Sequence, residues 1–464
     1  MIYTFLAIIA ASLVLALASR RGHDHQGAKE FFTASGQFGP VLFFFLSVGE
    51  TYSVASMLGF PGGVYAKGGG FITWFFGYIL LAAPVLYFVG PLIWRAGALY
   101  GSATIPDFFG RHFGSRALEL TMACSAIVLL VPVGTTQFLG LRIVLSSLDL
   151  PVSPMVLVAL AGVMAFLYVV IAGLRASAFV AILKDGLMLG AILLVSAVAI
   201  AHWREGGTPI VTTAAPEPAL LHDKVFSIST MIVQAIGFAM IPQTWAFVFS
   251  ASHPGAIRQA QVVSPLYLLL FPLLMCVAYF ARLHGLHPPA PDFVFITTAQ
   301  ALLPPWLVGV VLAAITLSGL VLLASVCLAI SPLVTRNVVV GLDEPAQQRW
   351  ANVVTGLYLL LSIIGMTLAG KLIVTLNNLF YFGIVQFIPG FVAALCLARV
   401  GAGAIIGGLA AGWALAFGLY FAGVDVYGIN VGLVGLMLNA AVMLGLAAVW
   451  PRRGARSVMA RLRA

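Results

Sequence analysis

The sequence predicts an all-α polytopic membrane protein with about 13 transmembrane helices. Of its 464 residues, 62% are apolar and only 8% are charged, and the mean hydropathy is +1.09. A soluble chain carries about a quarter charged residues, so this composition excludes soluble enzymes, nucleic-acid-binding proteins and disordered scaffolds. One span needs roughly 20 apolar residues, and a chain of this length holds about ten to fourteen spans.

Apolar runs separated by polar breaks give thirteen expected spans. They cover residues 2–19, 40–66, 71–94, 117–147, 153–173, 178–202, 225–250, 260–283, 304–335, 350–369, 373–398, 402–422 and 429–450. The first run has no charged segment before it and is followed by Arg20 and Arg21. We therefore expect a retained helix there rather than a cleaved signal peptide.

The basic residues predict how the chain is oriented. Of its 23 Lys and Arg residues, sixteen fall on one side of the expected spans, five fall on the other side and two lie within spans. Basic residues concentrate on the inner side of a membrane. We expect a protein of the cell membrane with its N-terminus outside and its C-terminus inside, and the net charge of +9 reflects this topology rather than nucleic-acid binding.

Two of the expected spans are interrupted. The span at 40–66 contains the polar island Ser47-Val48-Gly49-Glu50-Thr51-Tyr52-Ser53 before Gly59-Phe60-Pro61-Gly62, and the span at 225–250 contains Ile241-Pro242-Gln243-Thr244. Proline frees a backbone carbonyl, and free backbone groups persist at membrane depth only where they line a cavity or bind a ligand. Paired broken helices that each open a run of five spans are typical of secondary transporters. Ordinary Gly/Pro kinks are the alternative.

Several motifs occur in a fixed order along nearly the whole chain. The segment Thr104-Ile105-Pro106-Asp107-Phe108-Phe109-Gly110-Arg111-His112-Phe113-Gly114-Ser115-Arg116 is the most specific, and Glu30-Phe31-Phe32, Gly59-Phe60-Pro61-Gly62 and Thr335-Arg336-Asn337 accompany it. In these residues the chain resembles the sodium/solute symporter family, which includes proline, pantothenate and monocarboxylate symporters. The resemblance implies a LeuT-type core of two inverted five-helix repeats, alternating access, and transport of a small organic solute together with a cation.

This resemblance divides the chain into five parts. They are a first helix and inner loop at 1–39, a first five-helix repeat at 40–202, an outer loop at 203–224, a second repeat at 225–398, and peripheral helices with a basic tail at 399–464. The expected partners are a small-molecule solute and the lipid bilayer, without nucleic acid, and the expected state is a monomer or weak oligomer. We expect no enzymatic activity and no cofactor, and Na⁺ or H⁺ as the coupling ion.

The resemblance also implies where a sodium ion would bind, and this chain departs from the pattern there. Family members use backbone carbonyls in the second span, matched here by Gly49 and Tyr52, and hydroxyl residues of the ninth span. One alignment of the ninth span offers Val321 and Leu322, and another offers Ala313, Ala314, Leu317 and Ser318, with Thr316 nearby. In the sixth span, Ala181 replaces an aspartate and Lys184 replaces a glutamine. A sodium site is therefore weakened in either alignment.

Lys184 is the most informative of these changes. Ionisable groups within a membrane are costly and are candidates for function, and a buried lysine can exchange a proton. We expect the Lys184 ammonium to occupy or neighbour the former sodium site, with Glu50 or Asp185 as its counter-ion. Two alternatives stay open: a fixed ion pair that only holds helices together, and ordinary sodium coupling through Ser318 and backbone carbonyls.

The solute site is expected where the two broken spans meet. Its candidates are polar or aromatic residues within apolar spans, namely Glu50, Thr51, Ser53, Ser56, Gln137, Gln234, Gln243 and Trp245. Gln137 and Trp245 fit helix packing equally well. The sequence thus predicts a symporter of a small organic solute coupled to sodium or to protons, and the alternative is a transporter-like solute sensor without net transport.

Overall fold

The chain folds into a bundle of helices. The computed structural model describes residues 1–18, 43–45, 52–148, 150–205, 220–368, 373–452 and 456–463. Within these residues, nine helices are long and apolar enough to cross a membrane, or ten if the bent pair at residues 221–250 counts as one span. The expected all-helical, polytopic architecture is confirmed.

The helices of the first half, in chain order, are α1 (Ile2–Ala18), the π-helical turn η2 (Ala55–Gly59), α4 (Phe60–Lys67), α5 (Gly69–Tyr100), α6 (Ile105–Phe113), α7 (Arg116–Ser146) and α8 (Pro154–Glu205). Those of the second half are α9 (Leu221–Phe238), α10 (Pro242–Ser250), α11 (Pro254–Val263), η3 (Ser264–Leu269), α12 (Leu270–Leu283), η4 (Pro291–Phe293), α13 (Val294–Leu302), α14 (Pro305–Pro332), η5 (Leu333–Val338), α15 (Glu344–Leu368), α16 (Ile373–Ile384), α17 (Phe387–Cys396), α18 (Ala402–Phe421), α19 (Val431–Val449) and α20 (Val458–Arg463).

Helical segments lie in all thirteen expected ranges, although their limits differ. The largest difference is α8, whose 52 residues form one helical segment over the two spans expected at 153–173 and 178–202. Within α8, Val180–Trp203 is long and apolar enough to cross a membrane, and Met155–Leu167 is a shorter apolar stretch. The expected break at 174–177 rested on the polar residues Arg175 and Ser177.

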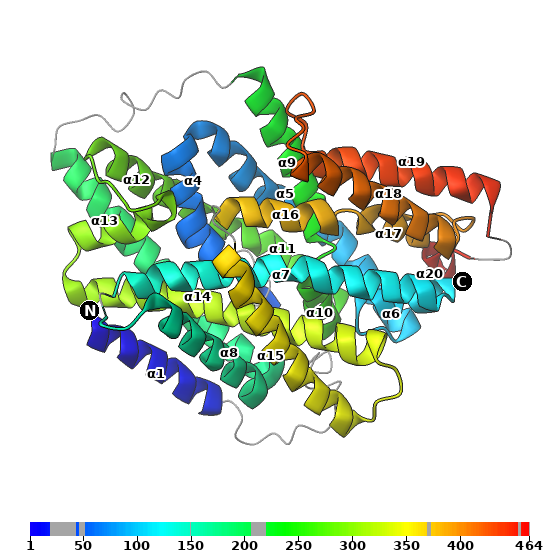
Figure 1. The fold of residues 1–464 in the computed structure, drawn as a ribbon, viewed down its shortest axis with the longest axis horizontal. Helices are drawn as coiled ribbons and strands as arrows, with labels where there is room; N and C mark the ends of the chain where they lie inside the picture. The colour runs from blue at the N-terminus through cyan, green and yellow to red at the C-terminus, as the bar shows by residue number, and fades with distance from the viewer. Residues whose placement is uncertain are drawn as a thin grey trace.

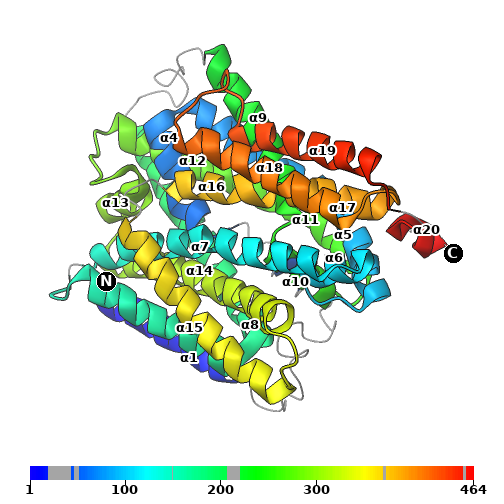
Figure 2. The same cartoon turned by 45° about the vertical axis from the view of Figure 1, so that its right-hand side comes forward.

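Helix α14 lies at the centre of the bundle. Figures 1 and 2 show it between α7 on one side and α1, α8 and α15 on the other, and it contacts all four. Its sequence is apolar on every face, and 89% of its most hydrophobic window is buried. A helix that is apolar all round belongs in a core, and α14 therefore forms the scaffold on which the broken helices pack.

The expected interruption of the span at 225–250 is present, whereas most of the polar island expected in the span at 40–66 lies outside the described residues. Helices α9 and α10 bend by 43° at a short break, and Pro242 begins α10. Proline at the first position of a helix is favourable because its missing N–H would have no partner there. In the other broken span, the π-helical turn η2 precedes α4, after residues 46–51, which lie outside the described part of the chain.

The two ends of the bundle carry different elements. Helices α6 and α20, together with η5, lie at one end, which we call the α6 end, and η4 and α13 lie at the other, the α13 end (Figure 1). At the α13 end, η4 packs on α4 so closely that a Cβ atom on Gly62 would lie 2.8 Å from Asp292 Oδ1. Asp292 accepts a hydrogen bond from Ile373 N, and burial raises the pKa of its carboxyl to about 6.

Candidate functional site

Lys184 of α8 reaches the broken segment that precedes η2. Its Nζ donates a hydrogen bond of 3.0 Å to the carbonyl oxygen of Tyr52 and lies 2.6 Å from Asp185 Oδ1 in an ion pair. The side chains of Lys184 and Asp185 are 0% and 1% exposed. The ammonium therefore lies beside one of the two carbonyls that the family resemblance assigns to a cation, with a carboxylate as its counter-ion.

The surroundings of this ammonium are apolar and aromatic. Ala181, one turn earlier on α8, is buried, so its methyl group supplies no oxygen ligand. The ring of Tyr52 packs against Tyr267 and Phe271 at centroid distances of 5.2 and 5.4 Å. These neighbours exclude water from the pair, and electrostatic interactions strengthen in such a site.

Helix α14 approaches the same segment with residues of the second alignment. Ser318 Oγ donates to the carbonyl of Ala314 at 2.8 Å and lies 4.0 Å from Met57 Sδ of η2. A Cβ atom on Gly319 would lie 3.2 Å from the side chain of Val54. Ala314 and Leu317 are fully buried and carry no side-chain oxygen. Ser318 is thus the one residue of this set with a side-chain oxygen, and its proton is donated within its own helix.

Three glutamines among the expected solute residues share an unusual property. Gln137 of α7, Gln234 of α9 and Gln243 of α10 are at most 2% exposed. The Oε1 atom of each has no hydrogen-bond partner among the residues that the structure describes. Buried amide oxygens are normally hydrogen-bonded, so these three acceptors are available to a ligand that donates hydrogen bonds.

The remaining solute candidates differ in their surroundings. Ser53 and Ser56 are buried beside η2, and Ser53 Oγ accepts a hydrogen bond from Ala55 N. Trp245 donates to the carbonyl of Ala239 in the break before α10, at 2.8 Å, and its ring packs against Phe108 and Phe391. The indole N–H therefore satisfies a backbone group at the break. Gly49, Glu50 and Thr51 lie outside the described residues.

Helix α16 joins the two broken spans and was not among the expected site elements. It contacts η2 and α9, and Asn378 Oδ1 accepts a 2.6 Å hydrogen bond from Gln234 Nε2. Adjacent asparagines, Asn377 and Asn378, in an otherwise apolar span were the available signal.

The most specific motif forms a polar cluster at the α6 end. Thr104 caps α6 by accepting from Asp107 N, Gly114 ends α6 at φ 63°, and Ser115 caps α7. Ser and Thr are favoured at helix N-caps, and glycine is favoured in the left-handed conformation that ends a helix. The motif therefore encodes the end of one helix and the start of the next.

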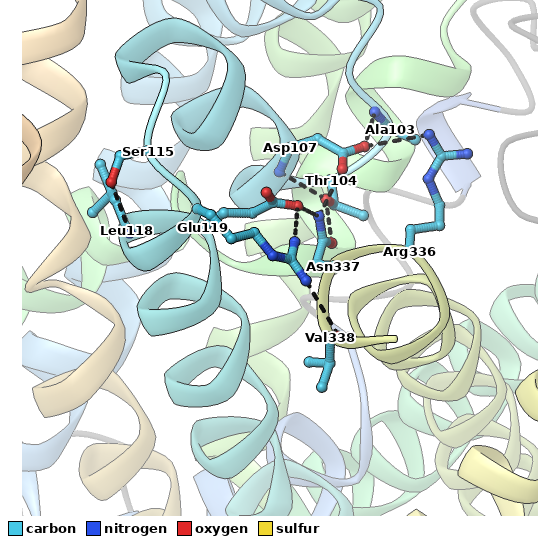
Figure 3. Close-up of polar contacts among 10 residues, drawn as sticks. Ala103, Thr104, Asp107, Ser115, Leu118, Glu119, Arg336, Asn337 and Val338 are labelled. Atoms are coloured by element: carbon cyan, nitrogen blue, oxygen red, sulfur yellow. Dashed lines mark hydrogen bonds and ion pairs between the residues drawn. The ribbon is translucent and has the colours of Figure 1, made fainter. Parts of the chain in front are cut away.

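Asn337 of η5 connects this motif to the end of the α14 segment (Figure 3). Its Nδ2 donates to Asp107 Oδ1 at 2.6 Å and to Glu119 Oε1 at 2.8 Å, and its Oδ1 accepts from Thr104 at 2.8 Å. Arg116 pairs with Glu119 at 2.9 Å. Sequence reasoning quoted both motifs but did not predict their contact, because they lie about 230 residues apart.

The sequence of the chain matches a known protein family over most of its length. The model of the Sodium:solute symporter family matches residues 31–400. The uncharacterized symporter YhjB of Bacillus subtilis (strain 168) is 27% identical, and the alignment covers 94% of each chain. A monocarboxylate transport permease protein of Rhizobium johnstonii is 28% identical over 65% of this chain and 62% of its own length.

Solved structures support the fold. A Na⁺-coupled sialic acid symporter in a substrate-bound, outward-open state superposes with a TM-score of 0.74 at 14% identity, covering 97% of this chain and 98% of that one. The transporter MhsT in complex with L-phenylalanine gives a TM-score of 0.55 at 14% identity, covering 88% and 98%. The expected LeuT-type architecture is confirmed.

Proposed function

The chain belongs to the sodium:solute symporter family, and we propose that it carries its solute with the Lys184 ammonium in the place of a coupling sodium ion. Membership makes it a multi-pass secondary transporter of a small solute and not an enzyme. The proposal concerns the coupling ion, and the observation that carries it is the contact of Lys184 Nζ with the Tyr52 carbonyl.

Charge explains why an ammonium here disfavours sodium. The Lys184 ammonium already supplies one positive charge to the Tyr52 carbonyl and the Asp185 carboxylate. Two unit charges about 4 Å apart repel each other by about 4 kcal/mol at an effective dielectric constant near 20. That energy lowers the affinity for a second cation roughly 1,000-fold. Of Ala314, Leu317 and Ser318, only Ser318 carries a side-chain oxygen, so α14 offers few ligands to a competing sodium ion.

A lysine also offers a route to proton coupling. Deprotonation of Lys184 removes the charge that pairs with Asp185 and weakens the hydrogen bond to Tyr52, at the segment that leads into η2. Protonation would hold this segment against α8, and proton release would free it.

We propose the buried glutamine oxygens of Gln137, Gln234 and Gln243 as solute ligands near the broken helices, since each lacks a partner within the described residues.

We also propose that the α6 end faces the inside of the cell and that the protein acts as a monomer or weak oligomer. Basic side chains gather at this end, including Arg111, Arg116, Arg336, Arg452 and Arg461. Arg452 donates to the carbonyl of His112 and Arg461 stacks on Tyr100. An inner position of these arginines follows the usual distribution of basic residues.

Uptake into proteoliposomes tests the coupling. Labelled monocarboxylates, neutral amino acids and vitamin acids are offered with sodium and proton gradients imposed separately. We expect uptake that a proton gradient drives and that is unchanged when choline replaces sodium. Lys184→Ala is compared with Lys224→Ala, an exposed lysine of α9. Strong sodium dependence in the wild type that Lys184→Ala retains would overturn the proposal.

A further inference from the structure

We propose that Arg336 binds the carboxylate of an anionic solute as the solute leaves through the α6 end. This inference rests on the proposed transport function and names the class of solute that it serves. It starts from a cavity of about 530 Å³ between α6, the start of α7 and η5, whose charged lining residues are Asp107, Arg111, Arg116, Glu119 and Arg336. This volume is within the range of small-molecule sites, roughly 300–1,000 Å³.

The guanidinium groups in this cavity differ in their partners. Arg111 Nη1 donates to the carbonyls of Tyr100 and Gly101, at 2.6 and 3.1 Å. Arg116 pairs with Glu119 and donates to the carbonyl of Val338. These two side chains are engaged in holding the ends of α5, α7 and η5, so neither is available to a ligand without local rearrangement.

Arg336 is held much less firmly. Its Nη2 lies 3.6 Å from Asp107 Oδ2, which is longer than a hydrogen bond, and its Nε is buried without a hydrogen-bond partner among the described residues. Asp107 is itself engaged, because Oδ2 accepts from Ala103 N and Oδ1 accepts from Asn337. Figure 3 shows Arg336 beside this cluster, joined to it only through Asp107.

Arg336 also lies beside α10, the second half of the broken helix. The same side chain lines a second, narrow pocket of about 10 Å³, together with Pro242 and Ala246 of α10 and Leu328 and Ala329 of α14. That volume holds about one water molecule. Arg336 therefore lines both a pocket the size of one water molecule beside α10 and the open cavity at the proposed inner face.

The chemistry of the side chain selects the ligand. A guanidinium presents a planar fork of donors that matches a carboxylate in two parallel hydrogen bonds. A small organic anion leaving the broken helices would exchange the loose contact with Asp107 for such a pair. A lipid phosphate offers similar oxygens, and the choice of vesicle lipid in the experiment distinguishes it from a free solute.

The experiment measures efflux of labelled pyruvate and lactate from proteoliposomes loaded over a range of concentrations. Arg336→Gln is expected to raise the half-saturating inner concentration roughly 10- to 100-fold, because the variant loses a charged hydrogen-bonded pair with the solute. Arg336→Lys, which keeps the charge without the fork, is expected to fall between Arg336→Gln and the wild type. Arg349→Gln, an exposed arginine of α15, serves as the matched control.

Each outcome decides between the two proposals. Equal half-saturation in the wild type and Arg336→Gln would overturn the role of Arg336 while leaving transport intact. A wild type that carries only uncharged or cationic solutes would likewise overturn this inference, and a wild type that transports no solute of the wider panel would overturn the proposed function as well. An effect that requires phosphatidylglycerol and disappears in phosphatidylcholine vesicles would assign the site to a lipid phosphate instead. Arg336→Gln also removes the ion pair with Asp107 and could fold poorly for that reason. Thermal stabilisation by pyruvate is therefore compared between the wild type and Arg336→Lys, a comparison that does not depend on the folding of Arg336→Gln.

Discussion

Removing the Lys184 ammonium should destabilise the protein in a way that sodium can repair. In Lys184→Met, the Asp185 carboxylate stays buried without its counter-ion, and the Tyr52 carbonyl loses its donor. Breaking a buried pair by removing one partner costs about 3–5 kcal/mol. The unfolding entropy of about 2.1 cal/mol/K per residue implies close to 1 kcal/mol per degree for 464 residues. We therefore expect a Tm lower by about 3–5 °C.

Sodium should recover part of this loss. Asp185 Oδ2, which has no hydrogen-bond partner in the described part of the chain, and the Tyr52 carbonyl are oxygen ligands that the missing ammonium leaves open. Sodium at ten times its Kd would restore about 1.4 kcal/mol. Thermal unfolding in detergent, with 150 mM sodium chloride (~10 Kd if the Kd is about 15 mM) against choline chloride, measures the effect. The wild type should give the same Tm in both salts.

The double variant Lys184→Met/Asp185→Asn provides the control. It removes both charges, so its Tm should lie closer to that of the wild type than the sum of the single changes predicts, by a coupling energy of about 0.5–3 kcal/mol. It should also be indifferent to sodium, since an amide is a weaker ligand. Additive single effects, or sodium stabilisation of the wild type equal to that of Lys184→Met, would refute the assignment of the ammonium to a cation position.

Three further predictions concern the two ends of the bundle. Burial raises the pKa of Asp292 to about 6, so the folded protein holds this proton up to about pH 6 while the unfolded chain releases it near pH 4. Stability should therefore fall as pH rises from about 4 to 6, and Asp292→Asn should flatten this slope in Tm measured across that range. Gly62→Ala should lower stability by about 1–3 kcal/mol, because its Cβ would lie 2.8 Å from both Asp292 Oδ1 and the Pro291 carbonyl; a Tm equal to wild type would show that η4 yields without cost. Asn337→Ala should cost about 2–4 kcal/mol through two lost hydrogen bonds to carboxylates, and an unchanged chemical or thermal unfolding midpoint would contradict that role.

The broken helices were predictable from local chemistry. Proline is disfavoured inside a helix and favoured at its first turn, so Pro242 predicted the break between α9 and α10. Lys184 was also found from sequence, because a charge within an apolar run is costly wherever the helix lies. These predictions use only residues that are close together in the sequence, so they do not depend on how distant segments pack.

Contacts between distant segments were not predictable in the same way. The identity of the counter-ion of Lys184 depends on how a flexible side chain turns, and the structure shows it paired with Asp185. The alignment of α14 stayed open because its faces are all apolar, and only packing brings Ser318 and Gly319 to η2. The contact of Asp107 with Asn337 required the fold itself, since no periodicity links residues on two separate repeats.

A cation that is part of the polypeptide has no bulk concentration. The Lys184 side chain is covalently part of every molecule, so the sodium concentration of the surroundings does not change how much of it is present. In such a carrier, the occupancy of the cation position would follow proton binding and would not depend on the sodium concentration. What it gives up is the energy stored in a salt gradient, so its work would depend on acidity alone.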